Sequence, residues 1–397
     1  MSDTPEKNWR LSTQLVRGGL ARTEFSETSE ALFLNSGYVY GSAEEAEESF
    51  DGTRERFVYS RFRNPTVAMF EDRLAMIEGA EVCRATASGM AAVHAAVLCQ
   101  VAAGDHVVAA RALFGSCLWI LGDLLKRYGV DVTFVDGTDA DQWKAALARP
   151  TRCVLIETPS NPTLEIIDIP AVAELTHAAG GLLIVDNVFA TPLLQKPLQL
   201  GADIVVYSAT KHIDGQGRCL GGAILGSNAF VTDVLGPYLR HTGPCLSPFN
   251  AWLLLKGLET LELRLARHVE NAGKVAAFLE GHAGIERVLY PSLTSHPQHD
   301  LARRQMTGGG SIVAFAPKGG KEAAYRLLNG LRLIDISNNL GDAKSLITHP
   351  WTTTHQSRTA EEKLNMGITE ASLRLSVGLE DAQDLVDDLA NALRLHT

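Results

Sequence analysis

The amino-acid sequence predicts an α/β protein, with a large, mostly parallel sheet domain followed by a smaller α+β domain. Short apolar runs alternate with amphipathic or alanine-rich stretches between residues 64 and 228. Strands that are apolar throughout, separated by helices, are typical of a parallel sheet covered on both faces. The pattern changes after Pro248, and the 397 residues exceed the usual size of a single core. We therefore expect more than one packed unit.

Residues 1–62 are expected to form an arm and not a domain. They have mixed polarity and contain an acidic run at residues 44–48, which is typical of a solvated helix face. The α/β domain is predicted to occupy residues 63–258. Its strands are expected at residues 106–110, 132–135, 153–156, 182–185, 204–207 and 223–225, and its helices at residues 90–101, 118–127 and 171–178.

The C-terminal α+β domain is predicted to span residues 259–397. It is introduced by long helical periodicity over residues 252–279, with leucine at positions 253, 254, 255, 258, 261, 263 and 265. Strands mixed with flanking helices then follow, a pattern typical of an α+β unit. The strands are expected at residues 311–315, 331–336 and 373–377, and the helices at residues 321–328 and 381–393.

Composition and charge exclude several classes of protein. The chain has 36 Lys and Arg against 46 Asp and Glu, a formal net charge of −10, which argues against nucleic acid or an anionic membrane as a partner. No apolar run reaches the ~18–20 residues needed to span a bilayer, and residues 1–7 are polar, unlike a signal peptide. Six scattered cysteines suit free thiols in a reducing cytoplasm, and no metal-ligand spacing is present.

A lysine follows the predicted strand at residues 204–207, after two hydroxyl side chains, Ser208 and Thr210. Active sites of open α/β sheets gather at the carboxyl ends of strands. Lys211 at that edge is suited to form a Schiff base with an aldehyde cofactor, while the two hydroxyls are suited to its phosphate. Taken alone, the motif is weak, because an exposed lysine after a strand is the commoner case.

An acid ends the preceding predicted strand, twenty-five residues before Lys211. Asp186 is suited to pair with a protonated pyridine nitrogen, although aspartates in turns are common at strand ends. The combination of this acid with the lysine motif is much rarer than either part. It makes pyridoxal phosphate (PLP) the leading candidate for a cofactor.

Three further places on the same predicted edge suit this cofactor. Ser88, Gly89 and Met90 begin an alanine-rich helix, where backbone amides can bind a phosphate, although taken alone an ordinary capped helix is the commoner case. Phe114 follows a strand and is suited to stack on a pyridine ring, or else to pack in the core. Asn161 lies in a proline-bounded turn and is suited to bond to the ring hydroxyl.

The alternative hypothesis of a nicotinamide-dependent oxidoreductase rests only on the glycine-rich segment at residues 215–221. That segment precedes a strand, whereas a dinucleotide-binding loop joins a strand to the following helix. No Gly-x-Ser-x-Gly motif is present to support a hydrolase. Both classes are therefore disfavoured.

Six segments occur in the order found in one enzyme family: residues 59–66, 88–90, 157–162, 186–187, 208–212 and 373–378. Together they resemble the cystathionine γ-synthase-like family of PLP enzymes, over nearly the whole chain. The resemblance implies the aspartate-aminotransferase-like fold (PLP fold type I). It also implies a homo-oligomer, at least a dimer and usually a tetramer, because the arm would reach into the neighbouring subunit's site.

The resemblance implies a role for each candidate residue. Lys211 would form the Schiff base and move protons, with help from Tyr59, and Asp186 would pair with the ring nitrogen. Phe114 and Asn161 would contact the ring. The phosphate would be bound by Ser88, Gly89, Met90, Ser208 and Thr210, together with Tyr59 and Arg61 of a neighbouring subunit.

The substrate would meet two other residues. Arg374 would hold its α-carboxylate, for which a guanidinium fork is suited. Asn339 would lie on the same side, at a position where relatives often have Ser. Relatives also mostly have Tyr where this chain has Phe114, which keeps the stacking but loses a phenol able to relay protons.

Within the family, residues 339–350 and 352–355 resemble the sulfhydrylases, and residues 212–218 resemble those acting on O-succinylhomoserine. That resemblance implies the replacement of succinate by sulfide, which gives homocysteine for methionine biosynthesis. Cystathionine γ-synthase and O-acetylhomoserine sulfhydrylase remain alternatives, because a fold does not determine a substrate. The resemblance to methionine γ-lyases would require Tyr-Gly-Cys at residues 114–116, whereas this chain has Phe-Gly-Ser there, which disfavours a lyase. A non-catalytic PLP-binding protein is disfavoured because Lys211, Asp186 and Arg374 are all present.

Overall fold

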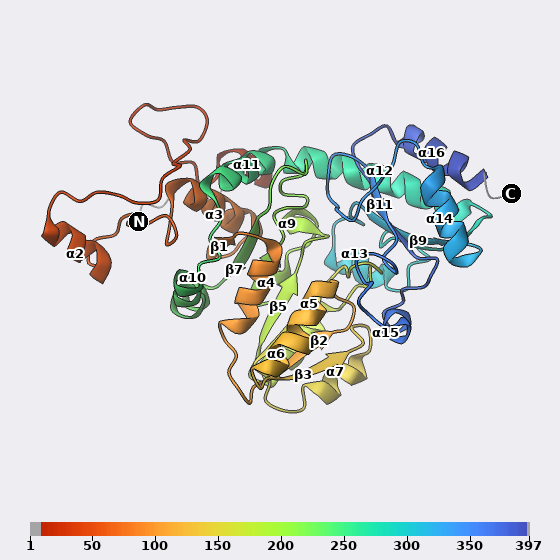
Figure 1. The fold of residues 1–397 in the computed structure, drawn as a ribbon, viewed down its shortest axis with the longest axis horizontal. Coiled ribbons are helices and arrows are strands. Elements are labelled where there is room, and N and C mark those ends of the chain that lie inside the picture. The colour runs from red at the N-terminus through yellow and green to blue at the C-terminus, as the bar shows by residue number, and fades with distance from the viewer. Residues whose placement is uncertain (1–8, 395–397) are drawn as a thin grey trace.

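The computed structural model describes residues 9–394 and contains two sheets (Figure 1). Residues 1–8, where no signal peptide was expected, and residues 395–397 lie outside the described residues. The larger sheet has seven strands. In spatial order they are β1 (Val82–Thr86), β7 (Gly222–Gly226), β6 (Ile204–Tyr207), β5 (Leu182–Asp186), β4 (Cys153–Glu157), β2 (His106–Ala110) and β3 (Asp131–Val135).

The large sheet is mostly parallel, as predicted. Strands β6, β5, β4, β2 and β3 pair in parallel, and only β7 runs antiparallel to its neighbours β6 and β1. The six predicted strands correspond to β2, β3, β4, β5, β6 and β7. Each begins and ends within one residue of its predicted bounds. Edge strand β1 was not predicted, because Arg84 interrupts its apolar pattern.

Both faces of the large sheet are covered, because successive side chains of a strand point to opposite faces. In β6, Ile204 and Val206 pack with α4 (Gly89–Leu98). Val205 and Tyr207 pack on the opposite face, in the same core cluster as residues of α3 (Pro65–Glu78) and α11 (Pro248–Glu259). This double cover explains why the strands are apolar throughout.

The remaining helices of the N-terminal part connect these strands or lie in the arm. Helix α2 (Ala43–Asp51) contains the acidic run and has no buried residue, which confirms the predicted solvated face. It projects away from the rest of the molecule (Figure 1). The others are α1 (Leu11–Arg17), α5 (Gly115–Trp119), η2 (Ile120–Leu124), α6 (Leu125–Arg127), α7 (Ala140–Ala146), α8 (Ile169–Ala178), α9 (Thr191–Leu194), η3 (Pro197–Leu200), η4 (Phe230–Leu235) and α10 (Gly236–Thr242).

The helical periodicity over residues 252–279 is confirmed, and the structure divides this stretch between two helices. Helix α11 ends at Glu259, and α12 spans Leu261–Gly281. Thr260 between them has φ −113° and ψ 6°, outside helical geometry. Its hydroxyl accepts a hydrogen bond from the Arg264 side chain at 3.2 Å. Continuous leucine periodicity did not reveal this break, because it reports burial and not backbone angles. The predicted domain boundary between residues 258 and 259 stays a prediction.

The second sheet belongs to the C-terminal part and has five strands. Their order is β10 (Asp335–Ile336), β11 (Leu346–Thr348), β12 (Leu373–Ser376), β9 (Ile312–Pro317) and β8 (Ile285–Leu289). Strands β8 and β11 were not predicted. The helices of this part, besides α12, are α13 (His299–Gln305), α14 (Gly320–Gly330), α15 (Ala360–Asn365) and α16 (Ala382–Arg394).

The strand predicted at residues 331–336 is mostly wrong, because only Asp335 and Ile336 pair with a neighbour. The backbone amides of residues 332–334 instead donate to the Asp388 carboxylate at 2.8–3.0 Å. A side chain from α16 therefore replaces the missing strand neighbour. Among residues 9–394, no helix is long and apolar enough to cross a membrane.

Candidate active site

A cavity of about 230 Å³ lies where the large sheet meets the C-terminal part. Strands β4, β5 and β6 run parallel, so their carboxyl ends meet at this edge. The cavity brings together most of the candidate residues from distant parts of the chain. Its lining includes Ser88, Gly89, Met90, Phe114, Asn161, Asp186, Ser208, Thr210, Lys211 and Arg374.

Lys211 follows β6 and lines this cavity. Its Nζ donates to Oδ1 of Asn339 at 2.7 Å. Burial, and next the positive charge of Arg374, lower the pKa of the lysine to about 8. A substantial fraction of the amine is therefore neutral, and able to act as a nucleophile or base, in mildly alkaline solution.

Asp186 is the last residue of β5, is half-buried and has no cation beside it. The Val188 amide donates to its Oδ1 at 3.1 Å, and no described Lys, Arg or His lies within ion-pair distance. Desolvation by the surrounding protein raises the pKa of this carboxyl to about 7. A desolvated carboxylate without a countercharge fits a ligand that brings a positive N–H group, as a protonated pyridine ring does.

The N-terminus of α4 lies close to the Ser208 loop. Ser88 caps the helix through its hydroxyl, which accepts from the Ala91 amide at 3.1 Å. A Cβ on Gly89 would come within 2.5 Å of the Ser208 Cβ, so only glycine permits this approach. Free helix amides beside the Ser208 and Thr210 hydroxyls make a cradle suited to a phosphate.

Arg374 lies on β12 and is 2 % exposed. Its Nη1 donates to Oδ1 of Asn161 at 2.9 Å, and its Nη2 donates to the Asn338 carbonyl at 2.8 Å. Its Nε is buried without a hydrogen-bond partner. Burial lowers the pKa of the guanidinium to about 10, against the opposing charge of Glu157. A buried cation with a free N–H group fits a ligand carboxylate.

Glu157 also lines the cavity, and the sequence analysis missed it. It is 1 % exposed, and its Oε2 accepts from the Phe114 amide at 2.8 Å. In the parallel register it pairs directly with Asp186. Burial, and next the Asp186 charge, raise its pKa well above the usual range. Glu157 and Asp186 each follow directly after a predicted strand, so the sequence already contained a signal for this pair of acids.

Two candidate residues make different contacts from those expected of them. Asn161 was expected to contact a cofactor ring, and its Oδ1 here accepts from Arg374. Asn339 was expected beside a substrate carboxylate. Its side chain accepts from Lys211, while only its backbone carbonyl, at 3.5 Å, approaches Arg374. Neither contact tests the roles that the resemblance implies.

Tyr59 and Arg61 lie in the arm and do not line this cavity, within the part of the chain that the structure describes. The Arg61 guanidinium lies 5.4 Å from the Tyr59 ring centroid and donates to the Arg240 carbonyl. Arg61 instead lines a separate hollow beside α10. Their proposed contact with a neighbouring subunit's site stays a prediction.

The geometry fits PLP at its three distinguishing groups: an amine for the aldehyde, a carboxylate for the ring nitrogen and a helix N-terminus for the phosphate. In the described residues, no group of three or more His, Cys, Asp or Glu side chains is placed to hold a metal ion. The fold and the cavity are those of a PLP-dependent enzyme.

Comparison with known proteins identifies the family. The chain belongs to the Cys/Met metabolism PLP-dependent enzymes, whose family model matches residues 12–394. It is 55 % identical over 382 residues to O-succinylhomoserine sulfhydrylase of Mycobacterium tuberculosis H37Rv, covering 95 % of this chain and 94 % of that protein. It is 49 % identical over 383 residues to the O-succinylhomoserine sulfhydrylase of Pseudomonas aeruginosa PAO1, and the match covers 96 % of this chain and 95 % of that protein.

A solved structure supports the same assignment at the level of the fold. Cystathionine γ-synthase from Xanthomonas oryzae pv. oryzae, in complex with cystathionine, has a TM-score of 0.93 and 36 % identity. The match covers 97 % of this chain and 98 % of that one. The expected PLP fold type I, with its large mostly parallel sheet and smaller C-terminal sheet, is confirmed.

Proposed function

We propose that this enzyme replaces the succinyl group of O-succinylhomoserine with sulfide, forming homocysteine and succinate in methionine biosynthesis. The observation that carries the proposal is one cavity holding an amine of lowered pKa, an unpaired carboxylate and an unsatisfied guanidinium. The two relatives that bear this activity in their names share about half of this chain's residues.

The cofactor would be held by this chain's own residues. Lys211 would bind the aldehyde, and Asp186 would keep the ring nitrogen protonated. Phe114 and Asn161 would border the ring. The phosphate would lie on Ser88, Gly89, Met90, Ser208 and Thr210. When bound, PLP supplies an aldehyde for the substrate amine and a ring that accepts electrons from the substrate.

The protein's part in the reaction is to place the substrate and to move protons. Arg374 would bind the substrate carboxylate, next to Asn339, and so orient the Cα–H bond toward Lys211. The Lys211 amine, neutral in a sizeable fraction near its pKa of about 8, would remove the α-proton and deliver it to the bound cofactor. The amine, neutral again, would then remove a β-proton. Succinate would leave the γ-carbon with the C–O electron pair, sulfide would form the new C–S bond, and Lys211 would return the two protons one at a time.

The active assembly is proposed to be a homodimer or larger, with a tetramer favoured. The solvated arm carrying Tyr59 and Arg61 would complete the site of a neighbouring subunit, and Tyr59 would assist proton transfer. A cytoplasmic location is also proposed, because all six cysteines are free.

The closest rival proposals differ only in the two substrates. O-acetylhomoserine sulfhydrylase would use an acetyl ester, and cystathionine γ-synthase would use cysteine in place of sulfide. The 36 % identity to the Xanthomonas cystathionine γ-synthase keeps the second rival open.

One matrix of assays separates these activities. Purified holoenzyme is given O-succinyl- or O-acetylhomoserine, each with sulfide or with cysteine, and in a separate reaction methionine alone, and homocysteine, cystathionine and 2-oxobutanoate are quantified. We expect the highest kcat/KM for the succinyl ester with sulfide. Preference for the acetyl ester, or for cysteine, would transfer the assignment to the corresponding rival. Release of 2-oxobutanoate from methionine as the fastest reaction would instead make the enzyme a γ-lyase.

A further inference from the structure

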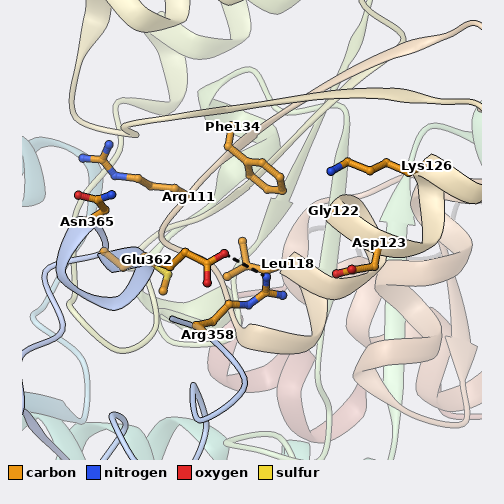
Figure 2. Close-up of a pocket in the computed structure, with 10 residues that line it drawn as sticks. Arg111, Leu118, Gly122, Asp123, Lys126, Phe134, Arg358, Glu362 and Asn365 are labelled. Carbon is orange, nitrogen blue, oxygen red and sulfur yellow. Dashed lines mark ion pairs between the residues drawn. The ribbon is translucent and has the colours of Figure 1, made fainter. Parts of the chain in front are cut away.

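A second and larger cavity, of about 440 Å³, lies away from the active site and shares no lining residue with it. One wall is the continuous helix α5–η2–α6, a second is edge strand β3, and a third is the segment that contains α15 (Figure 2). Its lining consists of Arg111, Leu118, Gly122, Asp123, Lys126, Phe134, Arg358, Glu362, Asn365 and Met366. A volume of this size is within the range of small-molecule sites.

The cavity has an apolar wall. Leu118 and Met366 are buried side chains of the adjoining core. Phe134, by contrast, is 39 % exposed on the edge strand, and its ring faces this hollow (Figure 2). An aromatic ring left in water at the mouth of a cavity favours a ligand with an apolar side chain.

Part of the charged lining is already satisfied within the protein. Arg111 pairs with Asp136. The Glu362 carboxylate accepts from the Thr359 amide at 2.7 Å and lies 3.7 Å from Arg358. These groups therefore shape the cavity and contribute no free charge of their own.

The remaining polar groups have no partner among residues 9–394. The side chains of Lys126 and Asp123 form neither an ion pair nor a hydrogen bond with a described residue, although they belong to the same helix. The Nε of Arg358 is buried and unpartnered. The Asn365 amide faces the cavity from the opposite side (Figure 2). The lining thus offers one free cation, one free anion, an unsatisfied N–H donor and an amide.

We propose that this cavity binds the zwitterion of an α-amino acid with an apolar side chain. The ligand carboxylate would lie toward Lys126 and the Arg358 Nε, and its ammonium toward Asp123. Its side chain would cover Phe134, Leu118 and Met366. A simple anion would leave Asp123 unpaired and a simple cation would leave Lys126 unpaired, whereas a zwitterion satisfies both.

The test measures binding of L-leucine to the holoenzyme by titration calorimetry, with the visible spectrum recorded in parallel. Leucine in the active site would perturb the cofactor spectrum, whereas leucine in this cavity would not. We expect a spectrally silent binding event that Lys126→Ala and Asp123→Asn each weaken by about ten-fold or more. Both positions are exposed, so the variants fold, which equal thermal unfolding midpoints would verify.

Matched controls locate the site and its chemistry. Arg127→Ala removes the next cation on the same helix, outside the cavity, and should leave leucine binding unchanged. Leucinamide lacks the carboxylate and 4-methylpentanoate lacks the ammonium, so each should bind about ten-fold more weakly than leucine, or worse. The proposal is overturned if no silent binding occurs, if Lys126→Ala leaves it unchanged, or if 4-methylpentanoate binds as tightly as leucine. None of these outcomes depends on which ester the active site accepts.

Discussion

Individual residues of the active-site cavity derive their chemical properties from burial. Arg374 is the clearest case, because a fully charged guanidinium is kept almost out of water with one N–H group unsatisfied. Such a group is costly to the free protein and gains most when a carboxylate arrives. The unliganded cavity is thus prepared for an anion.

Replacing Arg374 should therefore impair catalysis more than folding. We expect Arg374→Ala to lower kcat/KM for the amino-acid ester by ~30–1000-fold, which corresponds to loss of ~2–4 kcal/mol of charge-assisted contact. Arg374→Lys keeps the charge but loses the fork, so its loss should be smaller. Steady-state kinetics on both variants check this, and an unchanged kcat/KM for the alanine variant would remove the carboxylate role.

Asp186 predicts a pH dependence of stability for the apoprotein. Its pKa rises from 3.8 to about 7 on folding, so the native state prefers the protonated acid. The stability that this group contributes is full below about pH 4 and is lost as the pH rises through about 7. In the apoprotein, Asp186→Asn should thus raise the free energy of unfolding. This increase should be about 2–4 kcal/mol larger at pH 8 than at pH 4.

Urea denaturation of the apoproteins at both pH values measures this difference. Asp141→Asn is the matched control, because that carboxylate is 91 % exposed. The same Asp186→Asn change should weaken PLP binding, so its effect on stability reverses sign in the holoenzyme. A difference between the apoproteins that does not grow with pH would contradict the desolvated, unpaired carboxyl.

Glu157 offers a test of its protonation state. Burial and the Asp186 charge raise the pKa of Glu157 and so favour its protonated form, which glutamine imitates, and the glutamine carbonyl oxygen can still accept from the Phe114 amide. We expect Glu157→Gln to change the unfolding free energy little. Glu157→Ala leaves that buried amide unsatisfied and should cost ~1–3 kcal/mol. Equal destabilisation by the two substitutions, measured by urea unfolding at pH 7, would show that the glutamate is ionised.

At the scale of elements, the close approach of α4 to the Ser208 loop decides whether a phosphate cradle exists. Gly89→Ala places a Cβ 2.5 Å from the Ser208 Cβ, so the helix or the loop must move. We expect the variant to fold with at least ten-fold weaker PLP affinity, as one or more charge-assisted phosphate contacts are lost. Fluorescence titration of the apoprotein with PLP provides the measurement.

A second glycine separates this steric effect from helix propensity. Gly273 lies inside α12, and a Cβ there meets nothing within 4 Å. Gly273→Ala should stabilise the protein by ~0.5–1 kcal/mol and leave PLP affinity unchanged. If both variants kept full affinity, the approach of α4 to Ser208 would not matter for cofactor binding.

At the scale of the whole molecule, the proposed assembly makes a prediction about Tyr59 and Arg61. Both lie in the arm, outside the cavity of their own chain within the described residues. If a neighbouring subunit receives them, a Lys211→Ala chain and an Arg61→Ala chain, each impaired alone, form one complete site when they pair. We expect refolded equimolar mixtures to recover about a quarter of wild-type activity, the share of complete sites for random dimers.

Mass measurement in solution accompanies that mixing experiment. A monomer would rule out the shared site, and so would a mixture that stays at the average of its two components. Mixing Lys211→Ala with a second Lys211 substitution provides the control, because no pairing of those chains restores the amine.

The sequence by itself determined the parallel sheet, the place of most of its strands, and the cluster of Lys211, Asp186, Ser208 and Gly89 at one edge. These follow from local rules, since buried strands are apolar throughout and parallel strands end together. Tertiary structure alone decided the break at Thr260, the replacement of a strand by the Asp388 carboxylate, and the contacts of Asn339 and Glu157. Apart from the break at Thr260, each of these depends on a partner distant in the sequence, and residue patterns along the chain carry no record of such partners.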